Sequence, residues 1–139
     1  MQVPKPGLRQ TIILALLFMM VGTAFELILL EHYEDWQQLI PLVCIGAAML
    51  LVIVLFRNRS RLAVVSFKTV LGLTALSGVY GTYLHLQANY EFELEMRPTA
   101  AGWDLFAESM AGALPALAPG SMILLALIGY SFLTLITKP

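Results

Sequence analysis

Four long apolar runs dominate the pattern of hydrophobic and polar positions along the chain. They cover residues 11–30, 39–56, 62–86 and 121–137. Each is near the roughly 20 residues that an α-helix needs to cross a hydrocarbon core about 30 Å thick. The pattern therefore predicts an all-α integral membrane protein whose four transmembrane helices form one domain over residues 1–139.

The outer loop between the third and fourth runs, residues 87–120, begins with a different pattern. In the stretch "NYEFELEMRP" acidic positions alternate with apolar ones; the acidic residues are Glu91, Glu93 and Glu95, and the apolar residues are Tyr90, Phe92, Leu94 and Met96. A period of two is typical of a half-buried strand. We therefore expect residues 90–96 to be extended at the membrane surface, apolar face inward, and to dock a second copy or another protein. The alternatives are an irregular loop and a continuation of the third helix.

The same loop continues with "GWDLFAESMAGAL", residues 102–114, which has helical spacing. Its apolar positions are Trp103, Phe106, Ala107, Met110 and Leu114, and its polar stripe consists of Asp104 and Glu108. A tryptophan at one end and a narrow polar face predict an amphipathic helix at the membrane interface, with Trp103 part of the docking surface. The following "PALAPG" breaks the chain and turns it into the fourth span.

Composition agrees with a membrane protein. The chain is 59% hydrophobic and 12% charged, whereas a soluble domain is about 45–50% apolar and about 25% charged. The first run also has features of a signal peptide, with Lys5 and Arg9 before it and Gly22-Thr23-Ala24 within it. Because the run stays apolar up to Leu30, we interpret it as a retained span.

Charge is distributed unevenly between the two ends of the predicted spans. Seven of the eight basic residues fall at one end and Arg97 is the exception; the seven are Lys5, Arg9, Arg57, Arg59, Arg61, Lys68 and Lys138. The positive-inside rule then predicts that both termini are cytoplasmic, and we expect a bacterial inner membrane. All nine carboxylates lie at or near the opposite end. This acidic end either binds cations or a basic partner, or simply complements the basic inside.

Glu26 is the only carboxylate well inside a predicted span, and an ionisable group there is a functional candidate. Gly22 and Glu26 share one face of the first helix, and Gly78, Gly81 and His85 share one face of the third. Small residues let membrane helices approach closely. If these two faces meet, Glu26 and His85 come within hydrogen-bond reach, directly or through one water.

Two neighbouring residues extend this candidate site. Together with Glu26 and His85, Glu31 and His32 offer two carboxylates and two imidazoles, suited to a proton, zinc or copper. No compact motif such as H-E-x-x-H is present. The metal and any other cofactor therefore stay unknown, and haem has no axial ligands at a suitable depth.

Four spans in a short chain, with Glu26 in the first, resemble the small multidrug resistance transporters. That resemblance implies a membrane glutamate shared between protons and cationic substrates. This sequence departs from the family's pattern in three ways: Glu26 lies near the outer end, the loop after the third span is long, and the basic bias is marked. The likeness covers the span count and one residue, and we do not assign the chain to that family.

The sequence offers no candidate for catalysis or nucleic-acid binding. It contains no glycine-rich phosphate loop, nucleophile elbow or Cys–His pair in a convincing context. Its basic residues are too few for a nucleic-acid surface. We expect a non-enzymatic subunit or scaffold of a homo- or hetero-oligomeric membrane assembly, docking through the acidic outer loop. The alternative is a proton- or metal-cation-binding transporter component that uses Glu26, His85 and the acidic mouth.

Overall fold

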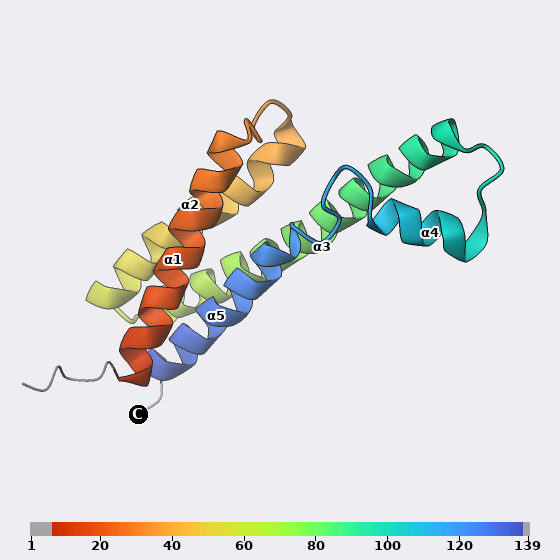
Figure 1. Cartoon of the computed structure of the whole chain (residues 1–139). Coiled ribbons are helices and arrows are strands. Elements are labelled where there is room, and N and C mark those ends of the chain that lie inside the picture. Colours follow the sequence, from red (N-terminus) through yellow and green to blue (C-terminus); the bar gives the residue numbers. More distant parts are fainter. Residues whose placement is uncertain (1–6, 138–139) are drawn as a thin grey trace, which may run out of the picture.

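The computed structural model describes residues 7–137 and shows them as five helices, with no strand in that range (Figure 1). They are α1 (Leu8–Leu29), α2 (Trp36–Arg57), α3 (Arg61–Met96), α4 (Gly102–Met110) and α5 (Gly120–Thr137). Four of them, α1, α2, α3 and α5, are long and apolar enough to cross a membrane. The predicted all-helical fold with four such helices is confirmed.

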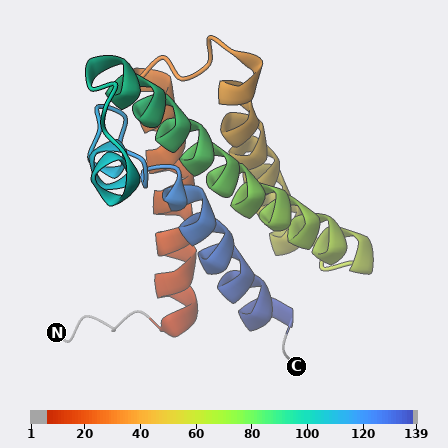
Figure 2. The ribbon, with the colours of Figure 1, turned by 90° about the vertical axis from the view of Figure 1, so that its right-hand side faces the viewer.

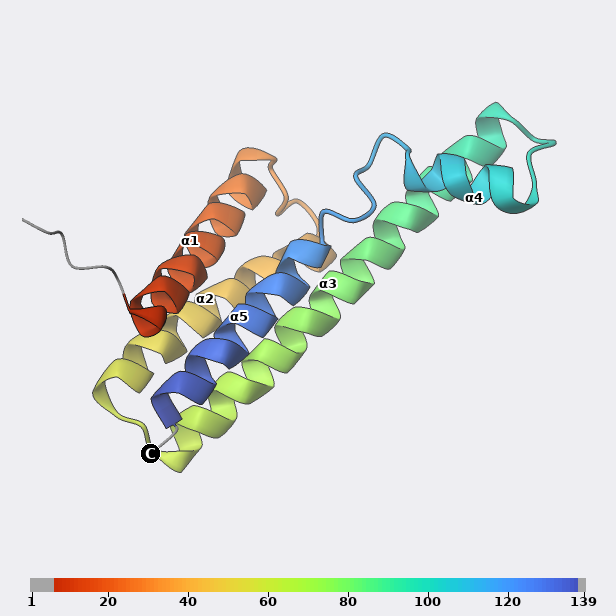
Figure 3. The ribbon, with the colours of Figure 1, turned by 60° about the horizontal axis from the view of Figure 1, so that its bottom comes forward.

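The four long helices alternate in direction along the chain. Figure 3 shows α5 between α1 and the long α3, with α2 against α3 as well. The start of α1, the α2–α3 turn and the end of α5 lie at one end of the bundle, where Arg59 Nη1 donates a hydrogen bond to the carbonyl oxygen of Ile136 at 3.0 Å. We call this the basic end and the opposite one the acidic end. Lys5 and Lys138 lie outside the described residues.

Glycines let α3 pack closely against α5 and against Pro119, just before α5. A Cβ on Gly129 would lie 2.5 Å from Leu71 Cδ2, and one on Gly78 would lie 2.8 Å from the carbonyl oxygen of Pro119. A Cβ on Gly22, by contrast, would meet nothing within 4 Å. The Gly22 face and the glycine face of α3 therefore do not meet, because Pro119 and the first turn of α5 occupy the α3 face.

The core is best filled toward the basic end. Phe67 of α3 and Phe132 of α5 are fully buried, with their rings edge to face at a centroid distance of 6.2 Å. Phe56 of α2 completes this cluster, 5.7 Å from Phe132. Such pairs stabilise a core beyond the apolar area they bury. Toward the acidic end the helices separate, and this separation positions the candidate sites.

Residues 90–96 are helical, so the expected extended segment is wrong and the alternative of a continued third helix is right. With 36 residues at about 1.5 Å each, α3 is about 54 Å long and exceeds a hydrocarbon core of about 30 Å. Two pairs spaced by four residues support the extra turns: Gln87 Nε2 donates to Glu91, and Arg97 donates to Glu93. A lone strand would have left its backbone groups unpaired, whereas a helix satisfies them internally.

The helix also redistributes the alternating side chains. At 100° per residue, Tyr90 lies above Leu94, and Phe92 lies on a different side of α3. The acidic residues Glu91 and Glu95 lie between these apolar groups. The four apolar residues of the alternating stretch therefore share no single inward face, contrary to the sequence-based expectation.

Candidate functional site

The projecting part of α3 and the short helix α4 form a helical hairpin, which we call the outer arm (residues 87–114). Figures 1 and 2 show α4 lying alongside the end of α3, beyond the start of α5. Leu105 and Ser109 form the buried face of α4 against α3. Trp103, at the other side, is 78% exposed and its ring lies 5.3 Å from that of Phe106. A helix is present in the predicted range 102–114, but α4 ends at Met110, and its aromatic side chains Trp103 and Phe106 are exposed.

Asn89 holds the arm together from a buried position on α3. Its Nδ2 donates to the carbonyl oxygens of Ser109 at 2.9 Å and Leu114 at 2.7 Å, and its Oδ1 accepts from the Leu114 backbone N–H at 3.0 Å. The amide side chain thus satisfies three backbone groups that no helix covers. Gly112 is required beside it, because a Cβ there would lie 2.5 Å from Asn89 Cγ. We call this arrangement the Asn89 clamp.

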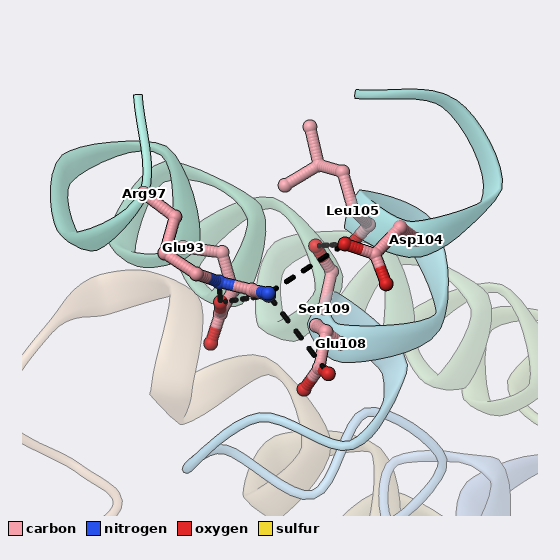
Figure 4. Close-up of polar contacts among 6 residues, drawn as sticks. All are labelled: Glu93, Arg97, Asp104, Leu105, Glu108 and Ser109. Atoms are coloured by element: carbon pink, nitrogen blue, oxygen red, sulfur yellow. Dashed lines mark hydrogen bonds and ion pairs between the residues drawn. The ribbon is translucent and has the colours of Figure 1, made fainter. Parts of the chain in front are cut away.

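Arg97, just after α3, links the two helices of the arm by charge (Figure 4). Its guanidinium donates to Glu93 at 2.8 Å and lies 3.6 Å from Asp104 and 3.9 Å from a carboxylate oxygen of Glu108. The hydrogen bond to Glu93 and the nearby carboxylates raise the pKa of Arg97, so the guanidinium stays charged. The polar stripe predicted for α4 therefore faces this arginine.

The surface of the arm is acidic with apolar patches. Between residues 87 and 114 the sequence has five carboxylates and one guanidinium, a net charge of −5 + 1 = −4. Glu93 is the most covered carboxylate in the Arg97 network, since its side chain is only 16% exposed. Of the other residues predicted to dock a partner, Leu94 is half-buried, and the exposed ones are Tyr90, Glu91, Phe92, Glu95, Met96 and Trp103.

A cavity of about 570 Å³ lies beside the arm, near the acidic end of the bundle. Its walls come from α1, α2, α3 and the segment 114–122 that leads into α5. Three of the four residues predicted for a proton or cation site line it, namely Glu26, His32 and His85. Glu31 does not line it. The structure therefore brings the first three to one cavity.

His85 is held by the segment that follows the arm. Its Nδ1 lies 3.1 Å from the carbonyl oxygen of Pro115. A carbonyl oxygen only accepts, so Nδ1 must carry the proton and Nε2 is the acceptor of the neutral ring. The rings of His85 and His32 are edge to face, with a centroid distance of 6.4 Å. Burial, and to a smaller extent repulsion by His85, lower the pKa of His32.

Glu26 and His85 share the cavity without a direct hydrogen bond between them in the part of the chain that the structure describes. Glu26 is exposed, and the partner of His85 is Pro115. Residues 7–137 also contain no group of three or more His, Cys, Asp or Glu side chains placed to hold a metal ion. The cavity is therefore an open site with polar groups in its lining, and it has no preformed metal centre within this range.

Glu31 has a structural part in placing His32. It is the one described non-glycine residue with positive φ, 52°, directly after the last turn of α1. The His32 N–H bonds to the Leu27 carbonyl oxygen at 2.8 Å, and the Glu31 N–H to that of Ile28 at 3.1 Å, which is the Schellman pattern of a helix end. Glycine usually occupies this position. The turn reverses the chain and brings His32 to the cavity.

Sequence reasoning missed the residues that organise the arm. The pairs Gln87–Glu91 and Glu93–Arg97 have the i, i+4 spacing of a helix, and that signal could have favoured a continued helix. No local signal marks Asn89, because its partners are 20 and 25 residues away in the sequence. No model of a protein family, no curated protein and no solved structure matches this chain.

Proposed function

We propose that this protein is a non-enzymatic, membrane-embedded subunit that docks a basic partner through the outer arm. The observation that carries the proposal is the Asn89 clamp, which fixes α4 against α3 and leaves aromatic and acidic side chains exposed. An arm used only as a connection would need neither three hydrogen bonds from one buried amide nor exposed aromatic residues. Four helices of membrane-spanning length supply the anchor.

Preorganisation supports docking because it lowers the cost of association. Binding requires interface side chains and loops to become ordered, and the conformational entropy lost in this way opposes association. In the outer arm the backbone around Leu114 is already held by Asn89, and Arg97 already spans the two helices. The arm therefore presents a fixed surface with Trp103, Phe92 and Met96 exposed.

The charge of the arm favours a basic partner over a second copy. Two arms that approached each other would each bring a net charge of −4 and would repel. Opposite charge on a partner steers the encounter and excludes wrong partners. We therefore place a basic surface with apolar groups opposite the acidic stripe formed by Glu91 and Glu95.

The proposal places the arm outside the cytoplasmic membrane and both termini inside, by the positive-inside rule. Single-cysteine variants test this orientation, with Cys44 replaced by Ala and a cysteine at position 59 or 95. A membrane-impermeant maleimide added to intact cells should label position 95 and spare position 59 until the membrane is permeabilised. Preferential labelling of position 59 would reverse the topology and place the arm in the cytoplasm.

Site-specific crosslinking tests the docking function. A photoreactive residue at position 92, on the arm, is compared with one at position 43, which is exposed on α2 between the two ends of the helix. In native membranes position 92 should give a crosslinked protein band of one discrete mass, and position 43 should give lipid adducts. Glu91→Gln with Glu95→Gln should weaken the band, and Glu34→Gln should not. A ladder of many products, or a band that survives the double change and 1 M salt, would contradict a specific basic partner.

The alternative is a proton- or metal-cation-binding transporter component that uses Glu26, His85 and the acidic mouth. Glu26 and His85 share the cavity, but the described residues contain no three-ligand group for a metal ion. We therefore propose docking as the main function and consider separately which ligand the cavity could bind.

A further inference from the structure

The cavity near the acidic end has the size and length of a site for a small amphiphile. Its volume, about 570 Å³, falls within the range of about 300–1,000 Å³ that is usual for ligand sites. Its lining along α3 extends from Ser77 to His85, eight residues or about 12 Å. The lining therefore follows α3 over about two helical turns.

The lining of the cavity combines apolar and polar side chains. Leu27, Ile40 and Leu84 contribute apolar surface, and Met122 closes the side of α5. The carboxylates Glu26 and Asp35 and the amide of Gln37 lie near the loops at the acidic end. There the Gln37 side chain of α2 donates a hydrogen bond to the Tyr80 hydroxyl of α3 at 2.8 Å and joins the two walls. An occupant must then have an apolar body and a polar head.

The charged residues in the lining determine which kind of head group the ligand can have. Glu26 and Asp35 both line the cavity, and no lysine or arginine does. Both carboxylates are exposed, and carboxylate oxygens accept hydrogen bonds from donors. A phosphate or carboxylate head would find no cationic partner there and would be repelled. A head with N–H donors and a positive charge would complement both carboxylates.

We propose that this cavity binds a membrane-dissolved, single-chain amphiphile with an amine head, its ammonium group between Glu26 and Asp35 and its chain against Ile40 and Met122. The site shares Leu114 with the outer arm, does not require the docking function, and depends on the membrane placement given above. Ammonium–carboxylate hydrogen bonds are charge-assisted and about twice as strong as neutral ones. The head therefore contributes selectivity, and the apolar walls contribute affinity.

Three decyl probes of equal length test the proposal, each with a diazirine in the chain and with an amine, alcohol or carboxylate head. The full-length protein is reconstituted in phosphatidylcholine nanodiscs at pH 7.5, irradiated and mapped by peptide mass spectrometry. We expect the amine to label peptides that cover residues 23–41, 77–85 and 114–122, with the alcohol weaker and the carboxylate weakest. Unlabelled decylamine should compete with the labelled amine.

Two variants separate a specific site from general partition into lipid. Glu26→Gln with Asp35→Asn should reduce amine labelling of the cavity about tenfold and leave alcohol labelling nearly unchanged. Ser77→Leu should fill part of the cavity and reduce labelling by all three probes. Glu34→Gln, in the same loop as Asp35 but outside the lining, is the matched control. Circular dichroism of each variant checks that the helices are retained.

These outcomes decide whether the amine binds in the cavity or only partitions into the surrounding lipid. Equal labelling by decanoate and decylamine would overturn the charge argument, and so would unchanged amine labelling in the double variant. Adducts spread over lipid-facing positions such as Val43 and Leu50, with no response to Ser77→Leu, would show that no cavity site exists. The crosslinking test of docking measures contacts of the outer arm. Its result therefore does not depend on the outcome of the amine-labelling test.

Discussion

Replacing Asn89 by Ala should release α4 from α3 and leave the membrane helices intact. Asn89 is 3% exposed and makes three hydrogen bonds to the backbone of Ser109 and Leu114. At about 1 kcal/mol of net stabilisation for each bond, the arm should lose about 3 kcal/mol toward local opening. That loss corresponds to an increase of about 100-fold in the exchange rate of amides that the opening exposes.

Amide hydrogen exchange in detergent micelles measures this loss residue by residue. The Leu114 amide should respond most directly, since its N–H donates to Asn89, and amides in the core of α5 should not respond. Gln87→Ala is the matched control, because Gln87 is an exposed polar residue two positions away whose side chain makes a single surface hydrogen bond to Glu91. Protection of Leu114 that is unchanged by Asn89→Ala would refute the clamp.

A double-mutant cycle tests the same contact from the other side. A Cβ on Gly112 would lie 2.5 Å from Asn89 Cγ, so Gly112→Ala alone should also open the arm. In an Asn89→Ala background the new methyl group has room, so the second change should cost much less. Additive effects would show that the two residues do not share this space.

Three further predictions concern charge, backbone and pH. Arg97→Gln should increase hydrogen exchange in the arm less than Asn89→Ala does. Its difference from wild type should vanish in 1 M NaCl, where the screening length is about 3 Å. An increase in exchange that is independent of salt would contradict this prediction. Glu31→Gly should raise the free energy of unfolding by about 1 kcal/mol, because φ is 52° there, and thermal unfolding should show no such gain for Glu34→Gly. Because burial lowers the pKa of His32 in the folded protein, its imidazole becomes protonated in the unfolded chain at a higher pH than in the folded one. The free energy of unfolding should therefore decrease as pH falls below 6.5, until the pH reaches the folded pKa. His32→Gln should reduce that decrease in melting temperature between pH 7.5 and 5, and an identical pH profile would refute the assignment.

The spans could be predicted because each depends only on a continuous run of apolar residues in the sequence. Apolar side chains must face lipid, and about 20 in succession are needed to cross it. The fourth run was expected at 121–137 and α5 covers Gly120–Thr137. The third was expected to end at residue 86, ten residues before α3 ends at Met96. Rising polarity at Gln87 marks the end of the apolar surface, and a helix can continue past it into water.

The outer arm could not be predicted because its decisive contacts are distant in sequence. The alternation of Glu with Tyr, Phe, Leu and Met fits a strand, and the same residues also fit an exposed helix with an acidic stripe. The contact of α4 with α3 decides between the two, through Asn89 and through Arg97. The cavity was found only in part: Glu26, His32 and His85 were expected together, whereas Asp35 reaches it through a turn that the sequence does not announce.

One short segment joins the outer arm to the cavity. Leu114 is held by Asn89, the next carbonyl, of Pro115, accepts from His85, and Pro119 packs against the glycines of α3. Leu114, Pro115 and Pro119 all line the cavity as well. Opening the arm would therefore free one end of a cavity wall whose other end stays fixed at Pro119. The amine-labelling pattern should then change in Asn89→Ala at residues 114–118 while labelling on α1 persists, and unchanged labelling of the segment would show that the contacts at His85 and Pro119 hold the wall without the clamp.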